Sequence, residues 1–156
     1  MYKSRKFKKR KPFYHASKIS IMKAVITAAG MGTRLLPMTK EMPKEMMPIF
    51  SKINRKKCVM PLLQLIFQQM YECKINKYCF VVGREKRSIE DHFTPDYPFL
   101  KNSIQKNKNM ISNFYKKIDN SNLMWVNQNS PKGFGDAVRQ SEQFIGNDEF
   151  IVHAGD

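Results

Sequence analysis

The sequence predicts an α/β fold in which a mostly parallel sheet carries helices on both faces. Short apolar runs rich in β-branched residues alternate along the chain with segments whose apolar residues recur at helical spacing. This alternation is typical of βαβ units, because parallel strands need crossover connections. The chain has 156 residues and is 42% hydrophobic, which suits one domain with a substantial core.

The expected elements follow one another from Lys23 onwards. Strands are expected at 24–29, 78–82, 123–126 and 149–153, and helices at 62–73, 85–92, 110–118 and 135–144. Three prolines between residues 37 and 48 exclude one long helix there, and residues 96–109 are expected to form a surface loop. Because ligands bind at the carboxyl ends of parallel strands, the residues just after each strand are the candidates for function.

The positive charge is concentrated at the N-terminus. The net charge is +15, and 8 of the 28 basic residues fall among the first twenty, with no acidic residue. We expect residues 1–21 to form a disordered basic leader. Such an arm could bind nucleic acid or an anionic surface, but the sequence shows no helix-turn-helix, RNA-recognition or zinc pattern, so nucleic-acid binding ranks last. No apolar run approaches the ~20 residues that span a bilayer.

The cysteines and histidines predict no metal site of their own. Cys58, Cys73 and Cys79 are odd in number and lack paired ligand spacing, and the three histidines are scattered. We expect free thiols in the reducing cytoplasm, and hence a cytoplasmic protein.

The turn after the first strand, Ala28 to Leu35, is the first candidate for ligand binding. Its two glycines let the backbone approach a phosphate, and successive N–H groups can form an anion-binding nest. Arg34 adds a planar, permanently charged group. A dinucleotide fingerprint needs a third glycine where Leu35 stands, and a P-loop needs Gly-Lys-Ser/Thr; both are missing. A plain strand-to-helix turn explains the glycines but not Thr33-Arg34.

The surrounding residues resemble the signature block of the sugar-1-phosphate nucleotidyltransferases. The run KAVI, then GMGTRLLP, TK and PKEMMP between residues 23 and 48, is similar to the pattern GxGTRxLPxTK…PKEMxP of bacterial and archaeal UTP–glucose-1-phosphate uridylyltransferases. A second block, NQ at 127–128 followed by PKGFGDAV at 131–138, resembles the base-binding loop of that family. The resemblance covers Lys23 to Asp156.

The resemblance implies a three-layer, Rossmann-like nucleotidyltransferase fold of the glycosyltransferase-A type. Residues 22–156 would be the N-terminal, nucleotide-binding part. The residues implied in nucleotide binding are Ala28, Ala29, Gly30, Gly32, Thr33, Arg34, Lys44, Gln128 and Gly133.

The resemblance also assigns chemical roles to three of these positions and to Asp156. Arg34 and Lys44 would be catalytic, with Arg34 holding the leaving phosphates and Lys44 the reacting phosphate. Gln128 would read the pyrimidine edge, since an amide offers both a donor and an acceptor. Asp156 would hold Mg²⁺, which takes one or two carboxylates together with phosphates and waters.

The implied reaction transfers a uridylyl group from UTP to glucose 1-phosphate, giving UDP-glucose and pyrophosphate. Asp156 is the last residue whereas family members continue, so we expect a truncated fold without the sugar pocket and little activity alone. A non-catalytic nucleotide-binding remnant, or a subunit paired with a separate second half, stays open as an alternative. The sugar, UTP versus dTTP, and assembly as a homo-oligomer also stay open.

Overall fold

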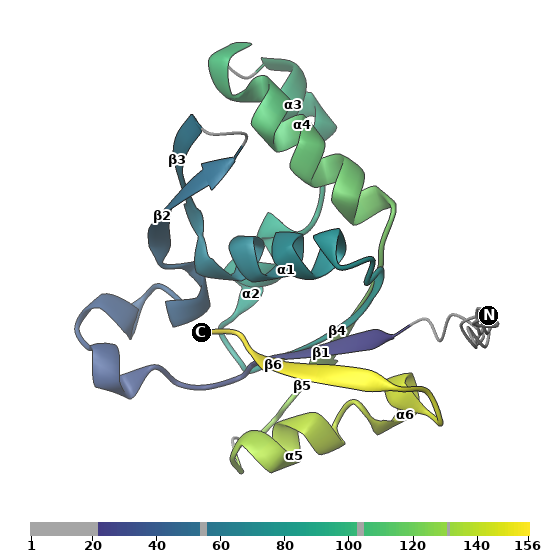
Figure 1. Ribbon diagram of the computed structural model, residues 1–156. Helices are drawn as coiled ribbons and strands as arrows, with labels where there is room; N and C mark the ends of the chain where they lie inside the picture. Colours follow the sequence, from purple (N-terminus) through teal and green to yellow (C-terminus); the bar gives the residue numbers. More distant parts are fainter. Residues whose placement is uncertain (1–21, 54–55, 103–104, 131) are drawn as a thin grey trace, which may run out of the picture.

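The computed structural model describes residues 22–53, 56–102, 105–130 and 132–156 (Figure 1). The expected leader, residues 1–21, lies outside the described residues. Four strands form the main sheet: β1 (Lys23–Ala28), β4 (Lys77–Val82), β5 (Asn122–Asn127) and β6 (Phe150–Ala154). Their order is β5-β4-β1-β6, and every neighbouring pair is parallel.

The strand pattern explains why β1 and β4 lie at the centre of the sheet. Both are almost continuously apolar, and five of the six residues in each are buried. Strands covered on both faces need such runs. The outer strands β5 and β6 instead mix exposed and half-buried residues. The predicted α/β class with a parallel sheet is therefore confirmed.

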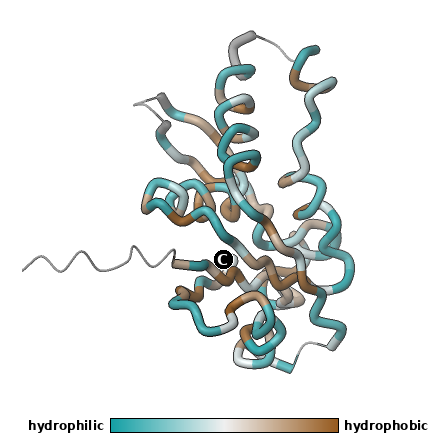
Figure 2. The backbone as a smooth tube through the Cα atoms, turned by 90° about the vertical axis from the view of Figure 1, so that its right-hand side faces the viewer, coloured by the Kyte–Doolittle hydropathy of each residue, from teal (hydrophilic) through white to brown (hydrophobic). Residues whose placement is uncertain are grey.

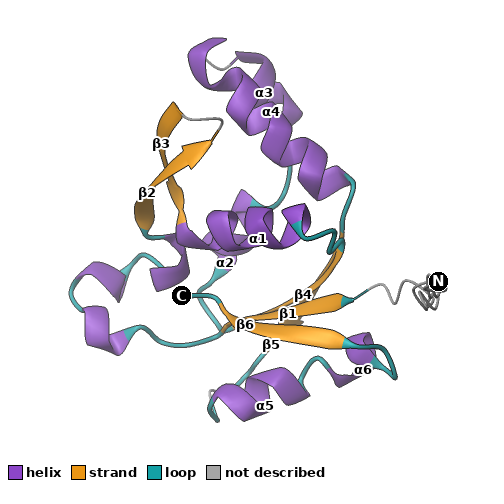
Figure 3. Cartoon of the chain, in the orientation of Figure 1, coloured by secondary structure: helices purple, strands orange, loops and turns teal. Residues whose placement is uncertain are grey.

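Helices cover both faces of this sheet (Figure 3). On one side lie α1 (Leu62–Glu72), α2 (Arg87–His92), α3 (Tyr97–Asn102) and α4 (Gln105–Asp119), and on the other α5 (Phe134–Arg139) and α6 (Glu142–Ile145). Side chains of a strand alternate between the faces. Ile26 of β1 thus belongs to the core under α1, whereas Val25 packs with Ala137 of α5.

The larger of these two cores contains a cluster of aromatic rings. The Phe67 ring of α1 lies 4.8 Å from the Tyr78 ring and 5.3 Å from the Phe93 ring, and the Phe80 ring stacks on Trp125 at 4.6 Å. Figure 2 shows the apolar stretches of the backbone gathered along the central strands. This core fixes one face of the strands whose carboxyl ends carry the candidate residues.

Two expectations about the connections are wrong, and one pair of strands has no counterpart among the expected elements. This pair is an antiparallel hairpin of β2 (Pro48–Ile53) and β3 (Lys56–Pro61). The described residues between 97 and 109 are helical and do not form the expected loop. α3 begins where the Asp96 carboxylate accepts the Phe99 N–H at 2.9 Å, and α4 begins at Gln105. The helix expected at 135–144 is two helices, α5 and α6.

The break between α5 and α6 has a local cause. Ser141 is fully buried, and both its N–H and its hydroxyl donate to the Val138 carbonyl, at 3.0 and 2.6 Å. These bonds close a tight turn that competes with a continuous helix.

Between β1 and the hairpin, the proline-rich stretch forms three single-turn 3₁₀ helices: η1 (Thr33–Leu35), η2 (Met38–Lys40) and η3 (Lys44–Met46). The absence of one long helix here is as predicted. Among the described residues, no helix is both long and apolar enough to cross a membrane.

Candidate functional site

The carboxyl ends of β1, β4, β5 and β6 lie at the same edge of the sheet, and two neighbouring cavities open there. We call the smaller one, of about 230 Å³, the strand-end hollow. The larger one, of about 610 Å³, is the outer cavity. They share Ala29, Gly30 and Gln128 as lining residues. The two cavities therefore meet at the turn after β1 and at the end of β5.

The strand-end hollow brings together six of the residues predicted from the sequence. Its lining includes Ala29, Gly30, Lys44, Gln128, Gly133 and Asp156. They come from the turn after β1, from η3, from the β5–α5 connection and from the end of β6. Residues up to 127 positions apart in the sequence thus face one space.

Four other predicted residues lie elsewhere. The Ala28 side chain is buried in the sheet. Gly32, Thr33 and Arg34 line neither cavity, and the Arg34 side chain is exposed. Gly32 shapes the turn instead: its φ of +68° suits glycine, and its carbonyl accepts the Thr39 hydroxyl at 2.6 Å.

Gly30 leaves room for a lysine above the turn. A Cβ built at Gly30 would lie 3.4 Å from both Cε and Nζ of Lys44. The Lys44 ammonium in turn lies 2.5 Å from the Asp156 carboxylate, with side-chain exposures of 19% and 41%. This ion pair links η3 to the end of β6 and places a cation and a carboxylate side by side in the hollow.

Asp156 is also the residue that could hold a metal ion. The described part of the chain contains no cluster of three or more His, Cys, Asp or Glu side chains suited to a metal. A single carboxylate fits Mg²⁺ when phosphate oxygens and waters complete the coordination.

A buried ion pair lies directly beneath these groups. Glu45 is fully buried, and its Oε2 lies 2.9 Å from the ammonium of Lys86, whose side chain is 9% exposed. A Cβ at Gly155 would lie 3.0 Å from Cγ of Glu45, so the glutamate packs against the backbone next to Asp156. The pair joins the loops after β1, β4 and β6. Glu45 stands inside the PKEMMP block, but nothing in the sequence pairs it with Lys86.

Gln128 is held in a fixed orientation. It is 4% exposed, its backbone N–H donates to the Val82 carbonyl at 2.8 Å, and its Nε2 donates to an Asp136 oxygen at 2.7 Å. This hydrogen bond, with a second from Arg139, lowers the pKa of Asp136. Asp136 is therefore an ionised partner of Gln128, and sequence reasoning had given it no role.

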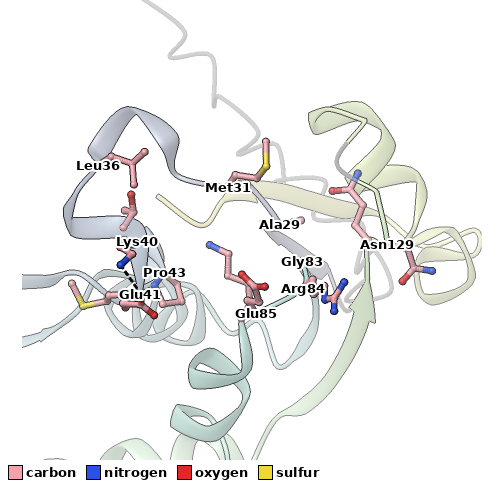
Figure 4. A pocket seen from close by; sticks show the side chains of 15 residues that line it. Ala29, Met31, Leu36, Lys40, Glu41, Pro43, Gly83, Arg84, Glu85 and Asn129 are labelled. Atoms are coloured by element: carbon pink, nitrogen blue, oxygen red, sulfur yellow. Dashed lines mark ion pairs between the residues drawn. The ribbon is translucent and has the colours of Figure 1, made fainter.

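The outer cavity extends the site toward η2 and the loop after β4 (Figure 4). Leu36, Lys40 and Pro43 lie on one side of it, and Arg84 and Asn129 lie on the other. Glu85 lies between the two sides with a φ of +67°, which is rare for a residue with a side chain. Arg84 and Glu85 are lining residues that sequence reasoning missed.

The similarity to known proteins covers the part of the chain that contains both cavities. The Nucleotidyl transferase family model matches residues 23–156. The UTP–glucose-1-phosphate uridylyltransferase of Streptococcus pyogenes is 40% identical over 136 residues, which are 87% of this chain and 42% of that protein. The same enzyme of Streptococcus pneumoniae serotype 4 is also 40% identical, over 87% of this chain and 43% of its own length.

Solved structures show the same likeness in three dimensions. An apo UDP-glucose pyrophosphorylase superposes with a TM-score of 0.73 at 34% identity, covering 86% of this chain and 47% of that one. A UTP-bound UGPase from Acinetobacter baumannii gives 0.72 at 28% identity, over 86% and 45%.

The present chain thus spans less than half the length of these relatives. The family model nevertheless matches every residue from the start of β1 to Asp156. The chain therefore belongs to the nucleotidyl transferase family.

Proposed function

We propose that the strand-end hollow and the outer cavity bind UTP, and that the protein to which this chain belongs transfers the uridylyl group to glucose 1-phosphate. The observation that carries the proposal is the convergence of Ala29, Gly30, Lys44, Gln128 and Gly133 on one hollow at the carboxyl ends of the strands. Ligands of open α/β sheets bind at this edge.

The base belongs at the Gln128 end and the phosphates at the Lys44 end. Gln128 offers an amide beside Gly133, whose φ of +99° requires glycine in the turn that starts α5. Lys44 offers an ammonium over Gly30, where no Cβ intervenes. A nucleoside triphosphate that spans this distance would meet a hydrogen-bonding amide at its base and a cation at its phosphates.

Charge neutralisation is the main chemical contribution of these residues. In the proposed reaction the oxygen of the sugar 1-phosphate attacks the α-phosphate of UTP and pyrophosphate leaves. Such a step depends on positioning and on stabilising negative charge. Lys44 would hold the reacting phosphate, and Arg34, exposed on η1, would meet the leaving phosphates only if the η1 turn approached the bound nucleotide.

Mg²⁺ fits the proposal as a cofactor held by Asp156. When bound, it would withdraw charge from the phosphate oxygens. In its absence the carboxylate is neutralised by Lys44 at 2.5 Å. We infer that a metal-bound triphosphate offers both groups a new partner, the metal for Asp156 and a phosphate for Lys44.

Calorimetric titration with UTP in the presence of Mg²⁺ tests the proposal. We expect Lys44→Met to weaken UTP binding by about tenfold or more, because a charge-assisted hydrogen bond contributes about 1.5–3 kcal/mol. Lys57→Met, which removes an exposed lysine from the hairpin, is the matched control and should bind UTP normally. Pyrophosphate release with added glucose 1-phosphate reports on chemistry. Binding of UTP that is unaffected by Lys44→Met would contradict the proposal.

A further inference from the structure

The amide of Gln128 has only one orientation that is compatible with its neighbours. Its Nε2 lies 2.7 Å from Oδ2 of Asp136 and 3.5 Å from the Gly133 carbonyl. Both of these neighbours are acceptors, because an ionised carboxylate has no proton to donate. If the amide were flipped, its oxygen would face a carboxylate oxygen at hydrogen-bond distance. The Asp136 carboxylate and the Gly133 carbonyl therefore hold the NH₂ group of Gln128 on their side of the amide.

Asp136 is well fixed for this task. Its second oxygen accepts from the Arg139 guanidinium at 3.1 Å, and its side chain is 14% exposed. The hydrogen bonds from Gln128 and Arg139 lower the pKa of Asp136, so the carboxylate stays ionised near neutral pH. Both Asp136 and Arg139 lie on α5, directly after the Gly133 turn. The helix thus carries the device that orients the amide.

With its NH₂ group engaged, Gln128 has only its carbonyl oxygen left for a ligand. No hydrogen bond to that oxygen is found among the residues that the structure describes. Gln128 lines both the strand-end hollow and the outer cavity. A base placed there would therefore meet only a hydrogen-bond acceptor, and no N–H of Gln128 would be free to donate to it.

We propose that Asp136 is a positioning residue that locks the Gln128 amide and thereby selects a pyrimidine with an N3–H donor, uracil or thymine, over cytosine. The inference rests on the proposed function, since it assumes that Gln128 meets the base. At N3 uracil carries a proton, whereas cytosine carries a lone pair that would oppose the Gln128 oxygen. A site built to hydrogen-bond one group rejects the analogue that lacks it, because a buried polar group is left unpaired.

The ratio of the UTP and CTP dissociation constants, measured by calorimetry with Mg²⁺, tests the assignment. We expect the wild-type protein to favour UTP by about 10- to 100-fold. In Asp136→Asn the new side chain can donate as well as accept, so the Gln128 amide can turn over. The ratio should then fall to within about threefold of unity. Glu142→Gln, the same change from acid to amide at an exposed position of α6, is the matched control and should retain the wild-type ratio.

The outcomes separate the inference from the proposed function. Absence of any nucleotide binding by the wild-type protein would overturn both. Wild-type binding with equal affinity for UTP and CTP, or an Asp136→Asn variant that keeps the wild-type ratio, would overturn the inference alone. A purely structural role for Asp136 predicts that both affinities fall together.

A measurement on the unaltered protein covers the case in which Asp136→Asn does not fold. The side-chain NH₂ protons of Gln128, assigned by NMR in the nucleotide-free protein, should show one proton shifted downfield by its bond to a carboxylate and protected from exchange. Resonances typical of a freely exchanging amide would overturn the inference.

Discussion

Replacing Lys86 with methionine would leave a charge without its partner in the interior. Glu45 is fully buried, and its Oε2 accepts from the Lys86 ammonium at 2.9 Å. Its other oxygen, Oε1, is also buried and has no hydrogen-bond partner among the described residues. Lys86→Met therefore removes the single described ion-pair partner of this carboxylate while keeping a side chain of similar length.

The expected loss is about 3–5 kcal/mol in the free energy of unfolding, which is the usual cost of removing one member of a buried pair. Since domains are stable by about 5–15 kcal/mol in total, the loss is a large fraction of the whole. For a domain of this size it corresponds to a fall in Tm of roughly 6–20 °C.

Thermal and urea unfolding followed by circular dichroism measure this loss. The double variant Glu45→Gln with Lys86→Met removes both charges at nearly constant volume, and we expect it to lose less than half as much stability. If Lys86→Met lay within about 1 kcal/mol of the wild type, or if the double variant were as unstable as the single one, the pair would not stabilise the loops as argued.

Other predictions follow from single contacts and from two pKa shifts. Gly83→Ala should lower the free energy of unfolding by about 1–3 kcal/mol, because the new Cβ would lie 2.9 Å from a main-chain oxygen in the turn after β1. Gly135→Ala in α5 is the control: its Cβ would have no neighbour within 4 Å, so urea unfolding should show a neutral or stabilising effect. Burial lowers the pKa of His92, so as pH falls the unfolded chain takes up a proton at a higher pH than the folded protein does. The free energy of unfolding should therefore fall as pH drops from about 6.5 toward the folded pKa, and His92→Gln should flatten that dependence. Burial raises the pKa of the Cys79 thiol to about 11, so a thiol reagent at pH 8 should label exposed Cys73 quickly and Cys79 only on unfolding.

The elements that sequence reasoning found are those with a local signal. β1 and β4 are almost continuous apolar runs, which are typical of strands buried on both faces. The hairpin had no such signal, because both of its faces carry apolar residues. Phe50 is 90% exposed opposite Val59 on the outer face, while Ile49 pairs with Met60 on the inner one. The period-2 alternation that marks a half-buried strand is therefore absent.

The residues of the candidate site also divide into those that the sequence could predict and those that it could not. Residues directly after strands could be chosen from the sequence, because parallel strands end at one edge. The contact between Glu45 and Lys86 joins residues 41 positions apart, and no pattern predicts it. Asp136 stood inside a quoted block, but its partner depends on the angle at which α5 leaves the Gly133 turn. Arg34 was chosen for its charge, and the structure places it on the outside of η1.

The central claim is that the loops at the carboxyl ends of the strands form one nucleotide site. Titration of the ¹⁵N-labelled protein with Mg²⁺ and UTP, followed through the backbone amide signals, tests it most directly. We predict shifts concentrated on Ala29, Gly30, Gln128 and Gly133. Shifts confined to the hairpin and α4, or no shifts at saturating UTP, would contradict the account.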